Sequence, residues 1–324
     1  MDLNHANKNG VDQGALLEYY LDLEESFSSE NGDNTFQLEC SIASNVVKKE
    51  EYIYVEGTEY GGIIDSVKLD TQKGTLYFKG RTWRGILESK IISPETGSDF
   101  LVVSGDLNEA LSSIIKSVNL TGLFAVPTEM SGITVSNFRF RYCDAYEGII
   151  KMLSQNGAKL HIEWNKGRVV ISAVPIVDFS QEKEISSDLF DFVIEETQHT
   201  VNHMIGLGKG ELSARQVVHK YIGVDGNITD KQYYFGNDEI MMKYDYPNCE
   251  SLEELEEKTA EKLLQEAVDS KVKITAYDLQ ADIGDKFTAT DVVSGLSVTQ
   301  YVVNKIITIR NGTIKINYKV GDIL

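Results

Sequence analysis

Short runs of aromatic and β-branched residues dominate the first third of the chain. The clearest are residues 16–23, 36–42, 52–55, 63–69 and 75–78. Such residues suit the pleated, half-buried surface of a sheet, and Gly-containing breaks separate several of the runs. The chain has four prolines, and none of them interrupts these runs. The pattern predicts a β-barrel or sandwich of about 100 residues.

The spacing of apolar residues changes to a helical period in the middle third. Asp106 with Glu109 and Asp144 with Glu147 each match a capping box, in which side chains bond free N–H groups at the start of a helix. Apolar residues follow each box on one helical face. These are Leu107, Ala110, Leu111, Ile114 and Ile115 in the first helix, and Tyr146, Ile149, Ile150 and Leu153 in the second.

A hairpin is predicted directly after the second helix. Residues 159–164 and 168–174 form its strands around the tight turn 165–167, so helix and hairpin make a small α+β unit. After about residue 200 the β character returns. A third capping box, Ser251 with Glu254, interrupts it and opens a helix expected over 251–269. Leucines mark one face of that helix, and we interpret its acidic opposite face as solvated.

The first and last parts of the chain show a similar order of strands and turns. The matching segments are 36–42 with 271–277, 50–55 with 285–290, 61–69 with 295–309, and 74–76 with 312–314. Two like domains in one chain allow three chains to present six comparable units in a ring. We therefore predict an α+β, β-rich fold in which two similar β-barrel or sandwich domains, 1–104 and 199–324, flank an α+β domain, 105–198.

Charge and cysteine content narrow the function. The net charge of −19 argues against specific DNA binding, because neutralising phosphates requires Lys and Arg. No stretch approaches the roughly 20 apolar residues of a membrane-crossing helix. Residues 1–14 lack the apolar segment of a secretory signal, so we expect folding in a cytoplasm. Cys40, Cys143 and Cys249 form no C-x-x-C pair, and we interpret them as reduced packing residues.

Two patterns are similar to metal or phosphate motifs. His199 and His203 have a spacing that places two ligands on one helical face, but their neighbours favour a strand. Thr200 also stands where the zinc protease motif has Glu. The Gly-Leu-Gly-Lys-Gly segment 206–210 lacks the following helix that a phosphate loop needs, so we predict a turn between strands. The histidines without a recognisable partner are His5, His161 and His219. We expect no metal and no cofactor.

Enzyme chemistry has little support in the sequence. A glycosidase needs two catalytic carboxylates, but the chain has 50 acidic residues, so the presence of two candidate carboxylates is no evidence for this activity. There is no G-x-S-x-G motif and no cysteine near a histidine in a recognisable context. Some aromatic residues could stack on sugars, although such residues more often fill β cores or protomer contacts. These are Trp83, Trp164, Tyr233, Tyr234 and Phe235. We expect no catalytic residue.

A series of short segments resembles one known family. Residues 78–87, FKGRTWRGIL, closing on 91–94, IISP, are similar to a segment in tail hub proteins of phages that infect Gram-positive bacteria. The helix–hairpin unit 144–174 resembles the insert domain of those proteins. Residues 207–211 and 283–287 are also similar to the family. The resemblance spans nearly the whole chain, and the segments occur in the family's order.

The resemblance implies a structural tail-tip or baseplate hub in a phage or prophage virion, made in the cytoplasm of the bacterial host. Such hubs are homotrimers whose paired tube domains match the sixfold tail tube around an axial channel. The implied partners are further copies of this chain, the distal tail protein, the tail tube and the tape-measure protein, with a receptor-binding protein as a further candidate. The family has no catalytic residues in the hub. No specific nucleic-acid binding and no membrane insertion are implied.

Two other functions remain open at this point. The first alternative is a glycan- or receptor-binding tail adhesin, suggested by the 16 tyrosines and the β domains. A hydrolase is the weakest reading. Because the chain ends at Leu324 soon after the last predicted strand, we expect no appended hydrolase of the kind carried by longer relatives.

Overall fold

The computed structural model describes most of the chain and divides into two compact units. The described residues are 2–44, 47–179, 190–196, 201–224, 226–249, 251–267, 270–276, 281–290, 297–310 and 312–321. The large unit comprises residues 1–192 and 273–324, and the small unit residues 193–272. The chain therefore passes from the large unit into the small unit and later returns to the large unit.

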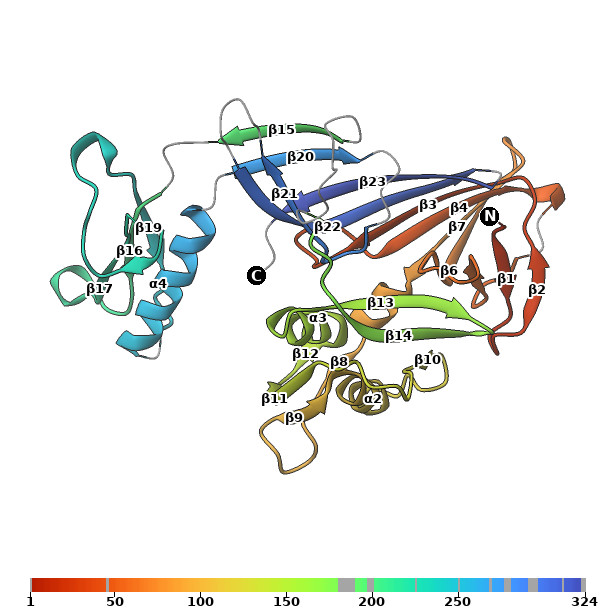
Figure 1. The fold of residues 1–324 in the computed structure, drawn as a ribbon, viewed down its shortest axis with the longest axis horizontal. Helices are drawn as coiled ribbons and strands as arrows, with labels where there is room; N and C mark the ends of the chain where they lie inside the picture. The colour runs from red at the N-terminus through yellow and green to blue at the C-terminus, as the bar shows by residue number, and fades with distance from the viewer. Residues whose placement is uncertain are drawn as a thin grey trace. The chain divides into compact units, whose positions relative to one another are not determined.

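A ten-stranded sheet forms the frame of the large unit. Its order is β2-β1-β5-β6-β7-β4-β3-β22-β21, with β23 paired to β22. The strands are β1 (Asn4–Ala6), β2 (Asp12–Ala15), β3 (Tyr19–Ser26), β4 (Thr35–Ser41), β5 (Tyr52–Tyr54), β6 (Gly61–Asp70), β7 (Thr75–Thr82), β21 (Lys286–Thr290), β22 (Ser297–Arg310) and β23 (Thr313–Gly321). Strands from both ends of the chain thus lie side by side, red beside blue in Figure 1.

Alternation of side chains fixes which face of this sheet is buried. In β3, Leu21 and Leu23 are buried while Asp22 between them is half-buried, and in β4 Phe36 and Leu38 are buried around the half-buried Gln37. Successive residues of a strand point to opposite faces, so a period of two separates an apolar face from a polar one. The apolar face continues into β22, where Ile307 and Ile309 are buried.

The middle of the chain forms a helical layer with its own core. It contains α1 (Trp83–Glu88), α2 (Leu107–Ser117) and α3 (Ala145–Gln155), together with β8 (Ile91–Ile92), β9 (Leu101–Asp106), β10 (Phe124–Ala125), β11 (Thr134–Phe140), β12 (Cys143–Asp144), β13 (Ala158–Asn165) and β14 (Arg168–Pro175). The predicted caps are confirmed, since Asp106 accepts a bond from Asn108 N at 2.8 Å and Asp144 from Glu147 N at 2.7 Å. The predicted hairpin is confirmed as β13 paired with β14.

The small unit packs one helix on a four-stranded sheet. The sheet order is β18-β17-β16-β19, and α4 lies against β16 and β17. The elements are β16 (His203–Leu207), β17 (Val217–Ile222), β18 (Ile228–Thr229), β19 (Met241–Asp245) and α4 (Leu252–Ala267), with single turns of 3₁₀ helix at Leu212–Ala214 and Gly236–Asp238. Leu255 and Leu263 are buried on the inner face of α4. Where the chain passes between the units, β15 (Phe190–Glu196) pairs with β20 (Ser270–Ala276).

The α+β, β-rich fold class is confirmed, but its arrangement differs from the expectation. The described strands form open sheets and no closed barrel. The two compact units also differ from the three predicted domains, 1–104, 105–198 and 199–324. The physical reason is the pairing of β22 with β3, which joins the last strands of the chain to the first in one sheet.

Candidate functional site

Polar side chains form rows across six neighbouring strands of the ten-stranded sheet, β6, β7, β4, β3, β22 and β23, on the face opposite the apolar one. We call this surface the polar face. The paired positions of one row are Ser66, Lys79, Gln37, Asp22, Thr308 and Lys315. The next row contains Lys68, Tyr77, Glu39, Tyr20, Arg310 and Thr313. All of these residues are half-buried or exposed.

Carboxylates on the polar face accept hydrogen bonds from uncharged side chains of β22. Thr308 Oγ1 donates to Asp22 Oδ1 at 3.0 Å, and Asn304 Nδ2 donates to Glu24 Oε1 at 2.8 Å. The hydrogen bond to Asp22 is the main cause that raises the pKa of Tyr20. Lys68, Lys79, Arg310 and Lys315 lie on the same face, so charges of both signs are mixed on this surface.

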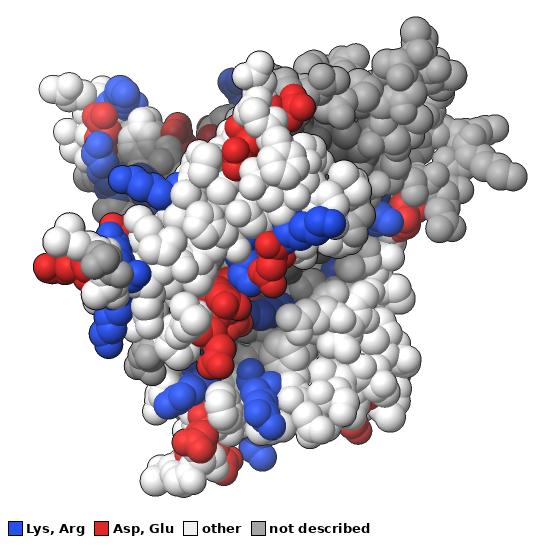
Figure 2. All heavy atoms as spheres, turned by 90° about the vertical axis from the view of Figure 1, so that its left-hand side faces the viewer, with Lys and Arg blue, Asp and Glu red and all other residues white. Residues whose placement is uncertain are grey.

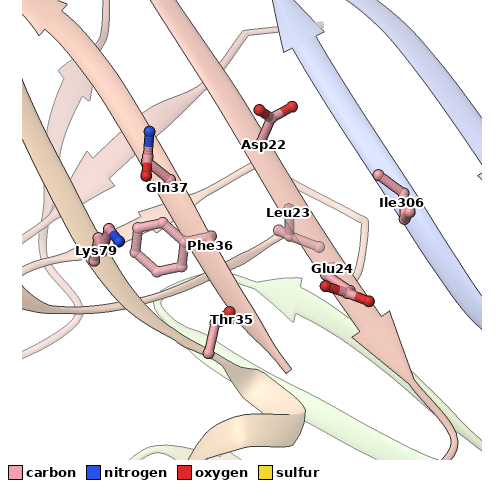
Figure 3. Close-up of a pocket in the computed structure, with 8 residues that line it drawn as sticks. All are labelled: Asp22, Leu23, Glu24, Thr35, Phe36, Gln37, Lys79 and Ile306. Carbon is pink, nitrogen blue, oxygen red and sulfur yellow. The ribbon is translucent and has the colours of Figure 1, made fainter. Parts of the chain in front are cut away.

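A shallow hollow lies in the polar face. It measures about 380 Å³ and is lined by Asp22, Leu23, Glu24, Thr35, Phe36, Gln37, Lys79 and Ile306. Figure 3 shows that these side chains come from four neighbouring strands, with Lys79 on β7 and the two carboxylates on β3. The lining contains neither a histidine nor a cysteine. It offers a polar surface with mixed charge.

Figure 2 shows that the molecule is not uniformly acidic. On the face drawn, Lys and Arg side chains (blue) lie close to Asp and Glu side chains (red), with large uncharged areas (white) between them. The net charge of −19 belongs to the whole chain. It therefore does not by itself describe the surface that meets a partner.

A chain of ion pairs is buried on the other side of the sheet. Arg84 of α1 contacts Glu25 of β3 at 2.8 Å and Glu59 at 2.5 Å, and Glu59 also pairs with Lys305 of β22. All four side chains are buried. Removing one partner of such a pair leaves an uncompensated charge in a region of low dielectric constant. We call these four residues the ion network, and it ties β3, β22 and α1 together.

The two acids of the ion network have opposite pKa shifts. Burial raises the pKa of Glu25 to about 7, helped by repulsion from Glu59 and opposed by Arg84. Burial would also raise the pKa of Glu59, but Arg84 and Lys305 together lower it to about 2. Glu59 has two cationic partners, whereas Glu25 has one, and its Oε1 atom has no hydrogen-bond partner. The number of partners explains the difference.

A second buried contact anchors the hairpin to the last part of the chain. Lys159 of β13 lies 2.7 Å from Asp285 and 2.8 Å from the half-exposed Asp282. Asp285 also accepts a bond from Val177 N at 2.9 Å. These contacts hold the helical layer to the segment that leads into β21. Sequence reasoning missed both ion clusters, because their members are far apart in the chain.

The structure places four of the five histidines, and two of them have partners that the sequence did not indicate. His199 lies outside the described residues. His203 is in strand β16, as predicted, and its Nε2 lies 2.8 Å from His219 Nδ1 while its Nδ1 lies 2.6 Å from Glu239. The expectation that His219 and His5 lack partners was wrong, since Glu51 lies 3.3 Å from His5. Cross-strand neighbours are invisible to local sequence patterns.

Other candidate groups have structural explanations. Among the described residues, no group of three His, Cys, Asp or Glu side chains could hold a metal ion. In the 206–210 segment, a Cβ on Gly206 would meet Thr259 Oγ1 of α4 at 2.0 Å, so this glycine permits close packing of the helix. The segment continues into a single 3₁₀ turn rather than a long helix.

The aromatic residues divide into a buried and an exposed set. Trp83 and Trp164 are buried and stack with ring centroids 5.2 Å apart, so these two fill the core, as aromatic residues of β domains more often do. Tyr233 and Phe235 in the small unit are exposed. Cys40, Cys143 and Cys249 form no disulfide; Cys40 and Cys249 are buried and Cys143 is half-buried. No helix in the described part of the chain combines the length and apolarity needed to span a membrane.

Comparison with known proteins gives a result for the fold. No family model and no curated protein matches the sequence. Solved structures of tail proteins match over 99% of this chain. Prophage tail protein gp18 from Listeria monocytogenes EGD-e has 12% sequence identity and a TM-score of 0.50, with 94% of that chain covered. The tail protein from Neisseria meningitidis MC58 has 14% identity, a TM-score of 0.51 and 97% of that chain covered, and the 43 kDa tail protein of prophage MuSo2 from Shewanella oneidensis has 11% identity, a TM-score of 0.54 and 98% of that chain covered. This chain shares its fold with phage tail proteins.

Proposed function

We propose that this chain is a structural protein of a phage or prophage tail, acting as the hub of the tail tip or baseplate. The observation that supports this most is the likeness of fold to three tail proteins over 99% of the chain. In this proposal three copies close into a ring that joins the tail tube to the tip. The association with Gram-positive hosts stays a prediction.

The sheet of the large unit suits the wall of such a ring. One of its faces is apolar and packs inward on the core, whereas no helix of the described residues covers the polar face (Figure 1). In the ring the polar face lines the axial channel. Lys79 and Lys68 alternate there with Asp22 and Glu39, so passing DNA meets neither a strong attraction nor a strong repulsion.

The proposed partners follow from this position. They are two further copies of the chain, the tail tube, the distal tail protein and the tape-measure protein, with a receptor-binding protein at the tip as a further candidate. The location is the virion tail, after synthesis in the bacterial cytoplasm. We also propose that the chain works by assembly and has no catalytic activity of its own.

The mass in solution and the position in tails test this proposal together. Light scattering coupled to size exclusion should give three times the 36.2 kDa of one chain. Electron microscopy of tails assembled with a tagged copy should place the tag at the end of the tube. Tails made without the chain should lack tips, and the parent chain supplied in trans should restore them. A chain that stays monomeric and is absent from purified tails would contradict the proposal.

A further inference from the structure

Two strand meanders in the large unit have the same geometry. In β5–β6–β7 and in β21–β22–β23, a short strand pairs with the start of a long one, which then turns back into a third strand. The bulge between Ile64 and Ser66 corresponds to the bulge between Val302 and Asn304. Gly74 and Gly312 occupy the two turns with φ of 64° and 80°. A single offset in residue number superimposes the bulges, the turn glycines and the third strands β7 and β23, whereas the short strands β5 and β21 need a slightly smaller one.

The two long strands differ in what lies at one edge. One edge of β22 pairs with β21 and then, over residues 304–310, with β3. The corresponding edge of β6 pairs with β5 over residues 61–63. Beyond that point, no strand in the described part of the chain pairs with residues 66–70 on this edge. An open edge of this kind presents backbone N–H and C=O groups ready to pair with another strand.

Apolar side chains on the open stretch of β6 lack the cover that their counterparts have. Val67 and Leu69 are 42% and 53% exposed, whereas Lys305 and Ile307 at the equivalent positions of β22 are 2% and 0% exposed. Val67 lies opposite the buried Phe78, so it points to the core side of the sheet. The equivalent stretch of β22 is covered because β3 lies beside it. A strand is therefore missing next to β6.

The order of the strands points to the occupant. β3 comes before β4 in the chain and pairs with it, and β15 stands in the same relation to β20. Their sequences also correspond, with Leu-Glu-Glu at 23–25 and Ile-Glu-Glu at 194–196. We propose that β15 of a second copy of this chain pairs antiparallel with residues 66–70 of β6, as β3 pairs with β22. This inference rests on the proposed function, since it specifies the contact that closes the ring.

The internal junction predicts the register of the contact between copies. Ile307 lies opposite Leu23, and Ile306 lies opposite Glu24. Transferred to the open edge, this register sets Leu69 opposite Ile194 and Lys68 opposite Glu195. An apolar pair and a pair of opposite charges are both favourable across neighbouring strands. A shift by one residue would instead set Leu69 opposite a glutamate or Lys68 opposite Ile194.

The contact is of a kind that closes into a ring. Each copy offers one open edge, β6, and one strand, β15, so the two partners use different surfaces. If the junction between copies repeats the β22–β3 junction within a copy, the successive units are related by equal rotations. Three copies then provide six like junctions. This matches the ring of three chains in the proposed function.

Disulfide formation between copies tests the register directly. Under oxidation, Leu69→Cys combined with Ile194→Cys should join copies covalently, because facing positions on paired strands bring Cβ atoms within reach of a disulfide. Each single variant serves as a control for the native thiols, and Leu69→Cys with Val193→Cys serves as the control for register. Linked species from the in-register pair alone are the expected result. A trimer that forms no link with this pair would overturn the inference and leave the proposed function standing, whereas no trimer at all would contradict the function.

Charge reversal provides an independent test. Lys68→Glu should weaken assembly roughly three- to fivefold per contact, because it sets two like charges opposite each other. Lys68→Glu combined with Glu195→Lys should restore it. Lys315→Glu, an exposed lysine on β23 of the same sheet, is the matched control and should leave assembly unchanged. Equal weakening of assembly by Lys68→Glu and by the control Lys315→Glu, with no rescue when Glu195→Lys is added to Lys68→Glu, would overturn the predicted contact.

Discussion

The β21–β22–β23 meander and the β5–β6–β7 meander share their strand order, bulges and turns, yet β22 is covered along both edges whereas β6 is open along part of one edge. β22 lies against β3 and above the ion network, so Ile307 is fully covered. β6 carries Leu69 at the equivalent position, and this side chain is half exposed. Both residues are apolar, so hydrophobicity alone does not decide burial. What decides it is whether another strand occupies the neighbouring edge.

The largest expected effect concerns the ion network beneath the covered half. Arg84→Met should lower the free energy of unfolding by about 3–5 kcal/mol, because Glu25 loses its one cation and Glu59 loses one of two. Urea unfolding of the purified protein measures this. Arg310→Met, at an exposed position on the polar face, is the control and should change little. A loss below about 1 kcal/mol at Arg84 would show that the network is dispensable for stability.

Truncation at the equivalent positions sharpens the comparison. Ile307→Ala should cost about 2–5 kcal/mol through lost burial and a cavity. Leu69→Ala should cost the isolated chain only about 0.5 kcal/mol, because half of this residue is already exposed to water, but it should weaken trimer formation. Thermal melts and light scattering on both variants separate the two effects. Equal losses of stability would mean that β6 is covered within one copy.

The pH dependence should also distinguish the covered half. The pKa of Glu25 is raised to about 7, so its contribution is complete at low pH and is lost as the pH rises from about 4.5 to 7. The pKa of Glu59 is lowered to about 2, so its contribution is lost only on acidification below about 4.5. Between pH 5 and 8, the parent should therefore lose up to about 3 kcal/mol that Glu25→Gln retains.

Urea unfolding at pH 5 and pH 8 provides the measurement for this prediction. Glu24→Gln, a neighbouring change on the polar face, should follow the parent at both values. Comparing variants with the parent removes the effect of the five histidines, which titrate in the same range. Identical slopes for the parent and Glu25→Gln would show that Glu25 is ionised throughout.

Substitutions in the turns of the two meanders should lower stability by similar amounts, so the smallest difference between the meanders is expected here. Gly312→Val and Gly74→Val should each cost about 1–3 kcal/mol, because both glycines have positive φ that a β-branched residue tolerates poorly. Gly122→Val is the matched control, since its φ is not positive and open space surrounds it. Thermal melts of the three variants give the ranking. A neutral Gly312→Val would contradict the equivalence of the turns.

Short-range features were predictable because their partners are a few residues away. The caps at Asp106 and Asp144 bond N–H groups two and three residues later, and the hairpin turn joins adjacent strands. The predicted acidic helix over 251–269 corresponds to α4, which begins one residue later and is described to Ala267. Residues 268–269 and His199 lie outside the described part of the chain. The similar order of strands in the two β regions was also visible locally.

The contacts of the ion network could not be predicted in this way. Glu59 and Lys305 are separated by most of the chain, and nothing beside either residue indicates a partner. His203 and His219 meet because β16 and β17 are neighbours in a sheet. A search for cross-strand pairs would have needed the sheet order first. In a chain with many charged residues, the sequence alone does not show which of them are buried.

The sequence by itself determined the local elements of this protein: which runs become strands, where helices begin, and that two similar meanders occur. These depend on periodicity, caps and turn glycines, which act over a few residues. Only the tertiary structure decided that β22 pairs with β3, which acids share Arg84, and that one edge of β6 stays open. Such choices depend on which of many compatible strands come together. That is set by the packing of the whole chain, because backbone hydrogen bonds alone do not distinguish one edge from another.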